Sequence, residues 1–150
     1  MASDAVNWTT RPENSEHFVG RDAILRWEYS SHPSNKIRFI KFGILVQANE
    51  TVTDLAILKK DMLTKVVMFN DKEESDREVV APFDGRVSML KNETASFKIT
   101  KLTMSDTGTY FCNLEPDWDQ NAGIPGLRDE VKIKVVGECG WYFHLYYYVC

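Results

Sequence analysis

Few residues of this 150-residue chain have the types and spacing that catalysis or metal binding needs. The three histidines, His17, His32 and His144, fall in separate loops or in the C-terminal segment, without the spacing of metal ligands. No Ser-His-Asp arrangement, glycine-rich phosphate loop or Cys-x-x-Cys pair accompanies them. We therefore predict a protein that is not an enzyme, binds no metal ion and needs no cofactor.

Oxygen-bearing side chains alternate in the stretch after Cys112, at Glu115, Asp117, Asp119 and Asn121. Calcium loops also place oxygen ligands at every second position, but they need a central glycine and a terminal glutamate, which are missing here. The pattern favours an acidic recognition loop. Trp118, at the expected tip of this loop, is a candidate anchor for a protein partner, because binding hot spots favour tryptophan and tyrosine.

The composition is that of an ordinary folded domain, with 43% hydrophobic and 27% charged residues. The net charge of −4 argues against a dedicated binder of nucleic acid or anionic membranes, which would carry a basic face. No run of 18 apolar residues could span a bilayer. Residues 1–6 lack the basic start and apolar middle of a secretory signal, so we expect either a cytosolic protein or an incomplete chain.

Short alternating apolar runs, separated by turn residues, predict a chain built of β-strands. A partly irregular edge strand is expected within residues 6–19, the mixed-charge run 71–78 predicts a solvated loop, and further strands are expected at 23–29, 37–46, 55–58, 65–69, 86–90, 97–102, 108–112 and 130–136. Eight or nine short strands of this kind are typical of an all-β sandwich.

The strongest local pattern is the run 106–112, Asp-Thr-Gly-Thr-Tyr-Phe-Cys. Asp106 and Gly108 supply turn chemistry. Tyr110 and Cys112 lie two residues apart, so their side chains leave the same face of a strand. An alternating apolar run ends where this turn begins, at Phe97, Ile99 and Leu102.

A strand followed by Asp-x-Gly-x-Tyr-x-Cys resembles the E–F corner of an immunoglobulin domain. The resemblance covers about residues 5–136, and the extra strands between Val46 and Pro82 resemble the variable type of this domain. It implies a Greek-key immunoglobulin-like β-sandwich of about nine strands over residues 1–136, followed by an aromatic tail, 137–150, that is disordered or truncated. It also implies a tyrosine hydroxyl bonded to backbone near the turn and a surface salt bridge between Arg86 and Asp106.

The chain departs from the family in its core, where the usual Cys-Trp-Cys trio reads Trp27, Phe39, Cys112. We interpret this as an exchange of volume in which Trp27 packs against the thiol and the phenyl ring. The missing disulfide forfeits about 2–5 kcal/mol in a small secreted domain. Pairing of Cys112 with Cys139 or Cys150 is disfavoured because Cys112 points inward, whereas a local Cys139–Cys150 bond stays open. The predicted core comprises Trp27, Phe39, Leu102, Tyr110 and Cys112.

Strand alternation also predicts a binding face. If Phe39 and Cys112 face the core, their outward-facing neighbours are Arg38, Ile40, Phe42, Phe111 and Asn113. An apolar patch with a polar rim of this kind marks protein interfaces, and in variable-type domains this sheet commonly pairs with a like domain. As an alternative, the segment 55–69 covers the patch within the monomer.

Three Asn-x-Thr triplets, at Asn7, Asn49 and Asn92, are candidate glycosylation sites. Together with the resemblance they favour an extracellular, cell-surface location, with the leader and any membrane anchor lying outside this chain. The predicted function is recognition of a protein partner, including a second copy of the chain, in cell adhesion or self-recognition. Two alternatives are a ligand-binding module of a growth-factor-type receptor and an intracellular structural domain.

Overall fold

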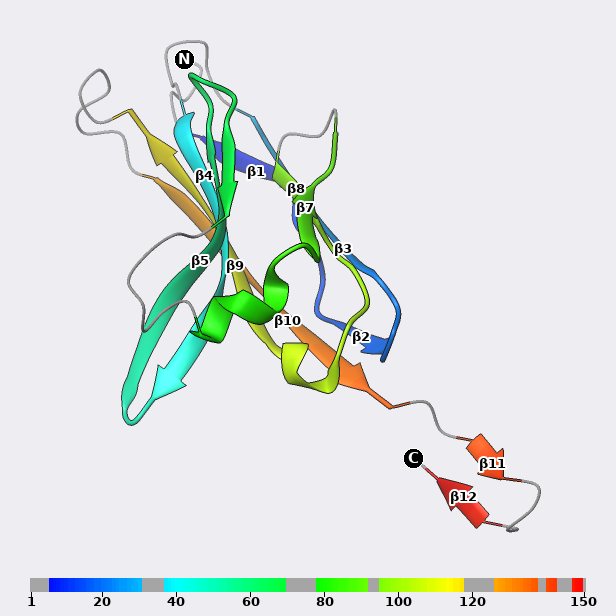
Figure 1. Ribbon diagram of the computed structural model, residues 1–150. Coiled ribbons are helices and arrows are strands. Elements are labelled where there is room, and N and C mark those ends of the chain that lie inside the picture. Colours follow the sequence, from blue (N-terminus) through cyan, green and yellow to red (C-terminus); the bar gives the residue numbers. More distant parts are fainter. Residues whose placement is uncertain are drawn as a thin grey trace.

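The computed structural model describes residues 6–30, 37–69, 78–91, 95–117, 126–137, 140–142 and 147–149. Two β-sheets pack face to face and enclose the core (Figure 1). The first sheet has four strands in the order β1 (Asn7–Thr10), β3 (Ala23–Ser30), β8 (Ala95–Ile99) and β7 (Val87–Met89). The predicted edge strand within residues 6–19 is divided, because its first half joins this sheet and its second half joins the other.

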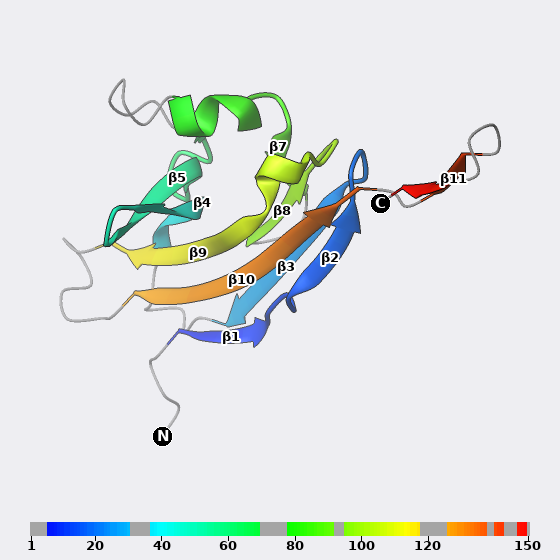
Figure 2. The ribbon, with the colours of Figure 1, turned by 90° about the horizontal axis from the view of Figure 1, so that it is seen from below.

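The second sheet has six strands in the order β2 (Ser15–Phe18), β10 (Leu127–Val136), β9 (Gly108–Pro116), β4 (Ile37–Ala48), β5 (Thr51–Asp61) and β6 (Val67–Phe69). β2 runs parallel to β10, and the other pairs in this sheet are antiparallel. Figure 2 shows β9 and β10 side by side in one layer and β3 in the layer behind it. The all-β sandwich is confirmed, with ten strands in the two sheets of the described chain.

Two 3₁₀ turns, Ala81–Phe83 and Met104–Asp106, connect strands of the sandwich. A separate hairpin, β11 (Gly140–Tyr142) paired with β12 (Tyr147–Val149), follows the last strand of the sandwich. The predicted tail therefore contains a strand pair after Val136, where β10 ends. The domain boundary at this residue stays a prediction.

The side chains of β4 point in the opposite directions from those predicted. Phe42 lies opposite Cys112 in the β4–β9 pairing, and Ile40 lies opposite Leu114. Directly opposed residues share a face, so both side chains point into the core, and neither has any exposed surface. Phe39 instead lies on the outer side and is partly exposed. The assignments of Ile40 and Phe42 to the surface and of Phe39 to the core were therefore wrong.

The physical reason lies in a charge on the strand. Lys41 alternates with Phe39, so a phase that buries Phe39 would also bury an ammonium group, whereas Ile40, Phe42 and Ile44 form an apolar row that points inward. The pairing with β9 is also irregular between Ile37 and Phe39. This bulge lets Ile37 and Ile40 both point inward, although they are three residues apart.

The core is a cluster of aromatic rings contributed by both sheets. The Phe42 ring stacks on Phe97, with centroids 4.5 Å apart, and on Tyr110, with centroids 5.8 Å apart. Trp27 lies 6.1 Å from Phe42 and 6.2 Å from Phe97 and is fully buried. Leu102, Tyr110 and Cys112 are also fully buried, as predicted. The Trp27 indole therefore packs against Phe42, whereas the interpretation as an exchange of volume expected it to pack against Phe39.

A hydrogen bond crosses between the sheets beside the free thiol of Cys112. Trp27 on β3 donates its indole N–H to Asp129 Oδ2 on β10 at 2.8 Å, and Asp129 lies opposite Cys112 in the β9–β10 pairing. Burial, followed by the nearby Asp129 carboxylate, raises the pKa of the Cys112 thiol well above its ordinary value. The thiol is therefore protonated and enclosed, and it forms no disulfide with Cys139 or Cys150.

The corner before β9 has the predicted chemistry. The Tyr110 hydroxyl donates to the backbone carbonyl of Asp106. Arg86 donates two hydrogen bonds to the Asp106 carboxylate, at 2.8 and 3.0 Å, and the Thr103 N–H donates a third at 2.8 Å. These contacts fix the start of β9, and with it the direction in which Tyr110 and Cys112 point.

Candidate protein-binding face

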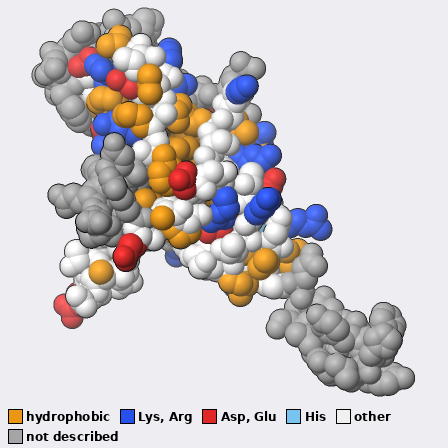
Figure 3. All heavy atoms as spheres, in the orientation of Figure 1, with side chains coloured by type: hydrophobic (Ala, Val, Ile, Leu, Met, Phe, Trp, Pro, Cys, Tyr) orange, Lys and Arg blue, Asp and Glu red, His pale blue; other side chains and the backbone are white. Residues whose placement is uncertain are grey.

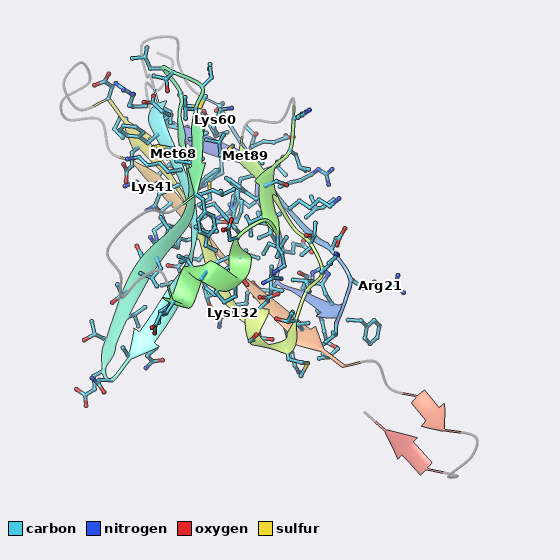
Figure 4. All side chains as sticks on the ribbon, viewed as in Figure 1. Arg21, Lys41, Lys60, Met68, Met89 and Lys132 are labelled. Carbon is cyan, nitrogen blue, oxygen red and sulfur yellow. The ribbon has the colours of Figure 1, made fainter. Side chains whose placement is uncertain are left out.

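The candidate binding face is the side of the six-stranded sheet that points away from the other sheet. Because Phe42 and Cys112 point inward, alternation directs their neighbours outward. We call this surface the outer face; its central side chains are Phe39 and Lys41 on β4, Lys59 and Asp61 on β5, Phe111, Asn113 and Glu115 on β9, and Arg128 on β10. In Figure 4, Lys41 projects from this side of the sheet, away from β7.

Phe39 lies between two cationic groups on the outer face. Lys59 Nζ is 4.0 Å from the centroid of its ring, and the guanidinium carbon of Arg38 is 5.1 Å away. Each contact is a cation–π interaction, worth about 0.5–1 kcal/mol at an exposed site. The ring is thus held in one position while part of it stays exposed to solvent.

Ion pairs fix the charged groups around Phe39. Arg38 donates to both carboxylate oxygens of Asp61, at 2.9 and 3.0 Å. The hydrogen bond from Arg38, together with the backbone N–H groups of Leu63 and Thr64, lowers the pKa of Asp61 to about 2. Lys41 Nζ lies 2.8 Å from Glu115 Oε1.

Phe111 points outward, as predicted, but it is only 1% exposed. Its ring lies over Gly43 on the neighbouring strand, where an added Cβ would come within 2.6 Å of the ring. The Arg128 guanidinium covers the ring from above, 4.7 Å from its centroid. Arg128 is held in turn by two hydrogen bonds to Asp54, at 2.6 and 2.9 Å, and by one to Asn113 at 3.3 Å.

The outer face is therefore a charged surface with aromatic rings set into it, not the apolar patch that the sequence predicted. The alternative in which the segment 55–69 covers the face is also overturned, because β5 and β6 extend the sheet sideways. Sequence reasoning missed Lys41, Lys59, Asp61 and Arg128. Cross-strand pairing makes these residues neighbours, and no motif in the sequence reports that pairing.

The remaining predicted site residues divide between described and undescribed segments. Trp118, Asp119, Asn121 and Asn92 lie outside the described residues. Glu115 and Asp117 approach Lys41 and Arg38, and no cluster of His, Cys, Asp or Glu suited to a metal ion occurs among the described residues. The side chains of Asn7 and Asn49 are exposed, the latter in the β4–β5 turn with a φ of 57°.

Within the described part of the chain no helix is long and apolar enough to cross a membrane. Comparison with known proteins identifies the fold. The structure superimposes on that of murine CRIg with a TM-score of 0.62 at 16% sequence identity, covering 87% of this chain and 98% of the other. It also superimposes on the two tandem V-type regions of VCBP3, a v-region-containing chitin binding protein, with a TM-score of 0.61 at 16% identity.

The VCBP3 match covers 90% of this chain and 47% of the VCBP3 chain, so this chain spans about half of that two-domain structure. No curated protein sequence matches the chain. A family model, the immunoglobulin V-set domain, matches residues 46–136. Domains of this family are typically extracellular, non-enzymatic modules that bind other proteins. With its two-sheet fold, the Tyr110 hydroxyl bonded to Asp106 at the corner before β9, and a matching family model, the chain belongs to the immunoglobulin V-set family.

Proposed function

We propose that this domain is a cell-surface recognition module that binds a protein partner through the outer face, in cell adhesion or self-recognition. The family supports a binding role. The outer face is suited to contact a partner, because four adjacent strands, β10, β9, β4 and β5, form it. The predicted contact residues Arg38 and Asn113 belong to it, and Ile40 and Phe42 do not.

The observation that carries the proposal is the position of Phe39. An aromatic ring that is partly exposed, and that Lys59 and Arg38 hold in place, loses little conformational freedom when a partner covers it. Aromatic residues and arginine are also the types enriched at binding hot spots. We therefore assign Phe39 as the anchor of the interface, with Arg38 beside it.

A second copy of the chain is the partner that the charges on this face support. Positive and negative groups alternate across it, with Arg38, Lys41 and Lys59 beside Asp61 and Glu115. When two copies pair about a twofold axis, the positive groups of one face can lie against the negative groups of the other. Self-recognition of this kind gives an association that weakens as the salt concentration rises.

Sedimentation equilibrium over a wide concentration range tests this assignment. Phe39→Ala is expected to weaken self-association at least tenfold, while the loss of its two cation–π contacts lowers the unfolding free energy by about 2 kcal/mol at most. Ile24→Ala, at an exposed apolar position on the other sheet, is the matched control and should change neither quantity. A wild-type protein that stays monomeric throughout, or equal losses in the two variants, would contradict the assignment.

The proposed extracellular location also rests on Asn7 and Asn49, because N-linked acceptor sites must be exposed. Asn49 projects from the tip of the β4–β5 hairpin, where a glycan meets no neighbouring strand. Glycosidase treatment of secreted protein is expected to remove mass, and the loss should be smaller by one glycan in the Asn49→Gln variant. An equal loss in the two proteins would contradict modification at this position.

A further inference from the structure

The outward side of the four-stranded sheet carries a surplus of positive charge. Figure 3 shows Lys and Arg side chains gathered on the right of the molecule, over β3, β7 and β8. We call this surface the basic face; its cations are Arg21, Arg26, Lys91, Lys98 and Lys101, and its carboxylates are Asp22 and Glu28. Among the described residues, five cations against two carboxylates give a net positive face on a chain whose net charge is −4.

The cations follow two paired strands in a row. Arg26 on β3 lies opposite Ser96, and Lys98 lies two residues farther along β8. Such diagonal neighbours have Cα atoms about 7–8 Å apart. Lys91 follows Leu90, whose N–H donates to the Ser96 carbonyl at 2.9 Å, and so marks one end of the row.

Arg21 and Lys101 mark the other end of the row. The Arg21 carbonyl accepts a hydrogen bond from the Leu102 N–H at 2.8 Å, which places the two segments side by side. From Ser96 to Ile99, where β8 ends, the chain advances roughly 10 Å at the rise of an extended strand, and Lys101 lies beyond that end. The row is therefore long and narrow, and it suits an extended ligand better than a compact one.

The carboxylates neutralise this row only in part. Asp22 lies 3.6 Å from Lys98 and also accepts the Lys101 N–H at 3.1 Å, and Glu28 accepts the Thr10 hydroxyl at 3.1 Å. Among the described residues, Arg21, Lys91 and Lys101 make no ion pair with a carboxylate. The outer face differs, because Arg38, Lys41 and Arg128 are each paired there at 2.9 Å or less.

We propose that the basic face binds a sulfated glycosaminoglycan, whose chain lies along β3 and β8 with its sulfates against Lys and Arg. A linear polyanion matches both the sign and the elongated shape of the row. Nucleic acid is disfavoured, since Phe18, in the turn beside Arg21 at one end of the row, is the one exposed aromatic ring near these cations among the described residues, whereas binding of single strands stacks successive bases on several rings. An anionic membrane is disfavoured because Ile24 is the one large apolar side chain exposed among the described residues of β3, β7 and β8.

Binding to immobilised heparin tests the proposal with a matched pair of triple variants. The test variant is Arg21→Gln, Lys91→Gln and Lys101→Gly; glycine suits position 101 because φ is 51° there. The control removes three charges from the other sheet and its β5–β6 turn, with Lys60→Gln, Lys65→Gly at a φ of 61°, and Lys134→Gln. Thermal melting checks that both variants fold.

The wild-type protein is expected to bind heparin with an affinity that falls steeply as salt rises. The test variant should lose at least tenfold in affinity and the control less than twofold. Equal losses in both variants, no wild-type binding at low salt, or equally tight binding of double-stranded DNA or phosphatidylserine vesicles would overturn the proposal. It rests on the proposed extracellular location but not on the protein interface, so Phe39→Ala should bind heparin normally.

Discussion

Strands β9 and β4 are neighbours in one sheet, yet different chemistry determines which of their alternate side chains point into the core. The phase of β9 is fixed by its own corner, where the Tyr110 hydroxyl and the Arg86 guanidinium both bind Asp106. No such corner accompanies β4 in the part of the chain that the structure describes, and the pairing of β4 is irregular both at Ile37–Phe39 and at Phe42–Gly43. A polar motif thus determines which side chains of β9 point into the core. On β4, the apolar residues alone allow either set of alternate side chains to point inward.

The largest effect that tests this comparison is expected from Phe42→Arg. Phe42 has no exposed surface and stacks between Phe97 and Tyr110. An arginine there loses the ring packing and buries a charge, so we expect a loss of at least about 4 kcal/mol and a chain that does not fold. Circular dichroism and thermal melting measure this loss.

Phe39→Arg, three residues earlier on the same strand, is the matched control. Its side chain lies on the outer face, so its two cation–π contacts are the main loss, and the decrease in unfolding free energy should stay below about 2 kcal/mol. If Phe42→Arg folds and Phe39→Arg does not, then Phe39 faces the core and Phe42 faces outward, as the sequence predicted.

The next largest effect concerns the bridge between the sheets. Trp27→Ala removes a fully buried ring and the hydrogen bond to Asp129, and it should cost about 3–5 kcal/mol. Trp27→Phe keeps most of the volume but leaves Asp129 without the indole donor, and it should cost about 1–3 kcal/mol. Urea unfolding measures both values, and a loss near zero for Trp27→Phe would mean that the Asp129 hydrogen bond contributes nothing.

Much of the fold was readable from the sequence, because its signals are local. The run from Asp106 to Cys112 predicted the corner, the buried tyrosine and the buried thiol, and the resemblance that it carries paired Arg86 with Asp106. Trp27 was placed in the core for the same reason, since β3 alternates without a break.

The candidate site was mostly not readable from the sequence. Phe39 and Phe42 are chemically alike, and the one charged residue between them in the chain is Lys41, which shares the outward row of Phe39 in the pairing with β9. The partners on the outer face are far apart in the chain, as in the pairs Arg38–Asp61 and Arg128–Asp54. The net charge of −4 likewise concealed the separation of charge between the two sheets.

The smallest expected effect is the pH dependence contributed by the corner of β9. Burial would raise the pKa of Asp106, but hydrogen bonds from Arg86 and Thr103 outweigh it and hold the pKa below its usual value. The folded state therefore binds this proton less readily than the unfolded chain. The resulting stabilisation is complete above pH ~4, the unfolded value, and is lost as pH falls through the folded pKa.

Asp106→Asn removes this dependence together with the charge that Arg86 binds. We expect a loss of about 2 kcal/mol at pH 7, as for hydrogen bonds to a charged group. As the pH falls from about 5 to about 2, a window that spans the ordinary carboxyl pKa, the unfolding free energy of the wild-type protein should decrease more than that of the variant. Parallel pH profiles for the two proteins would show that the Asp106 carboxylate does not hold the corner, and the phase of β9 would then need another cause.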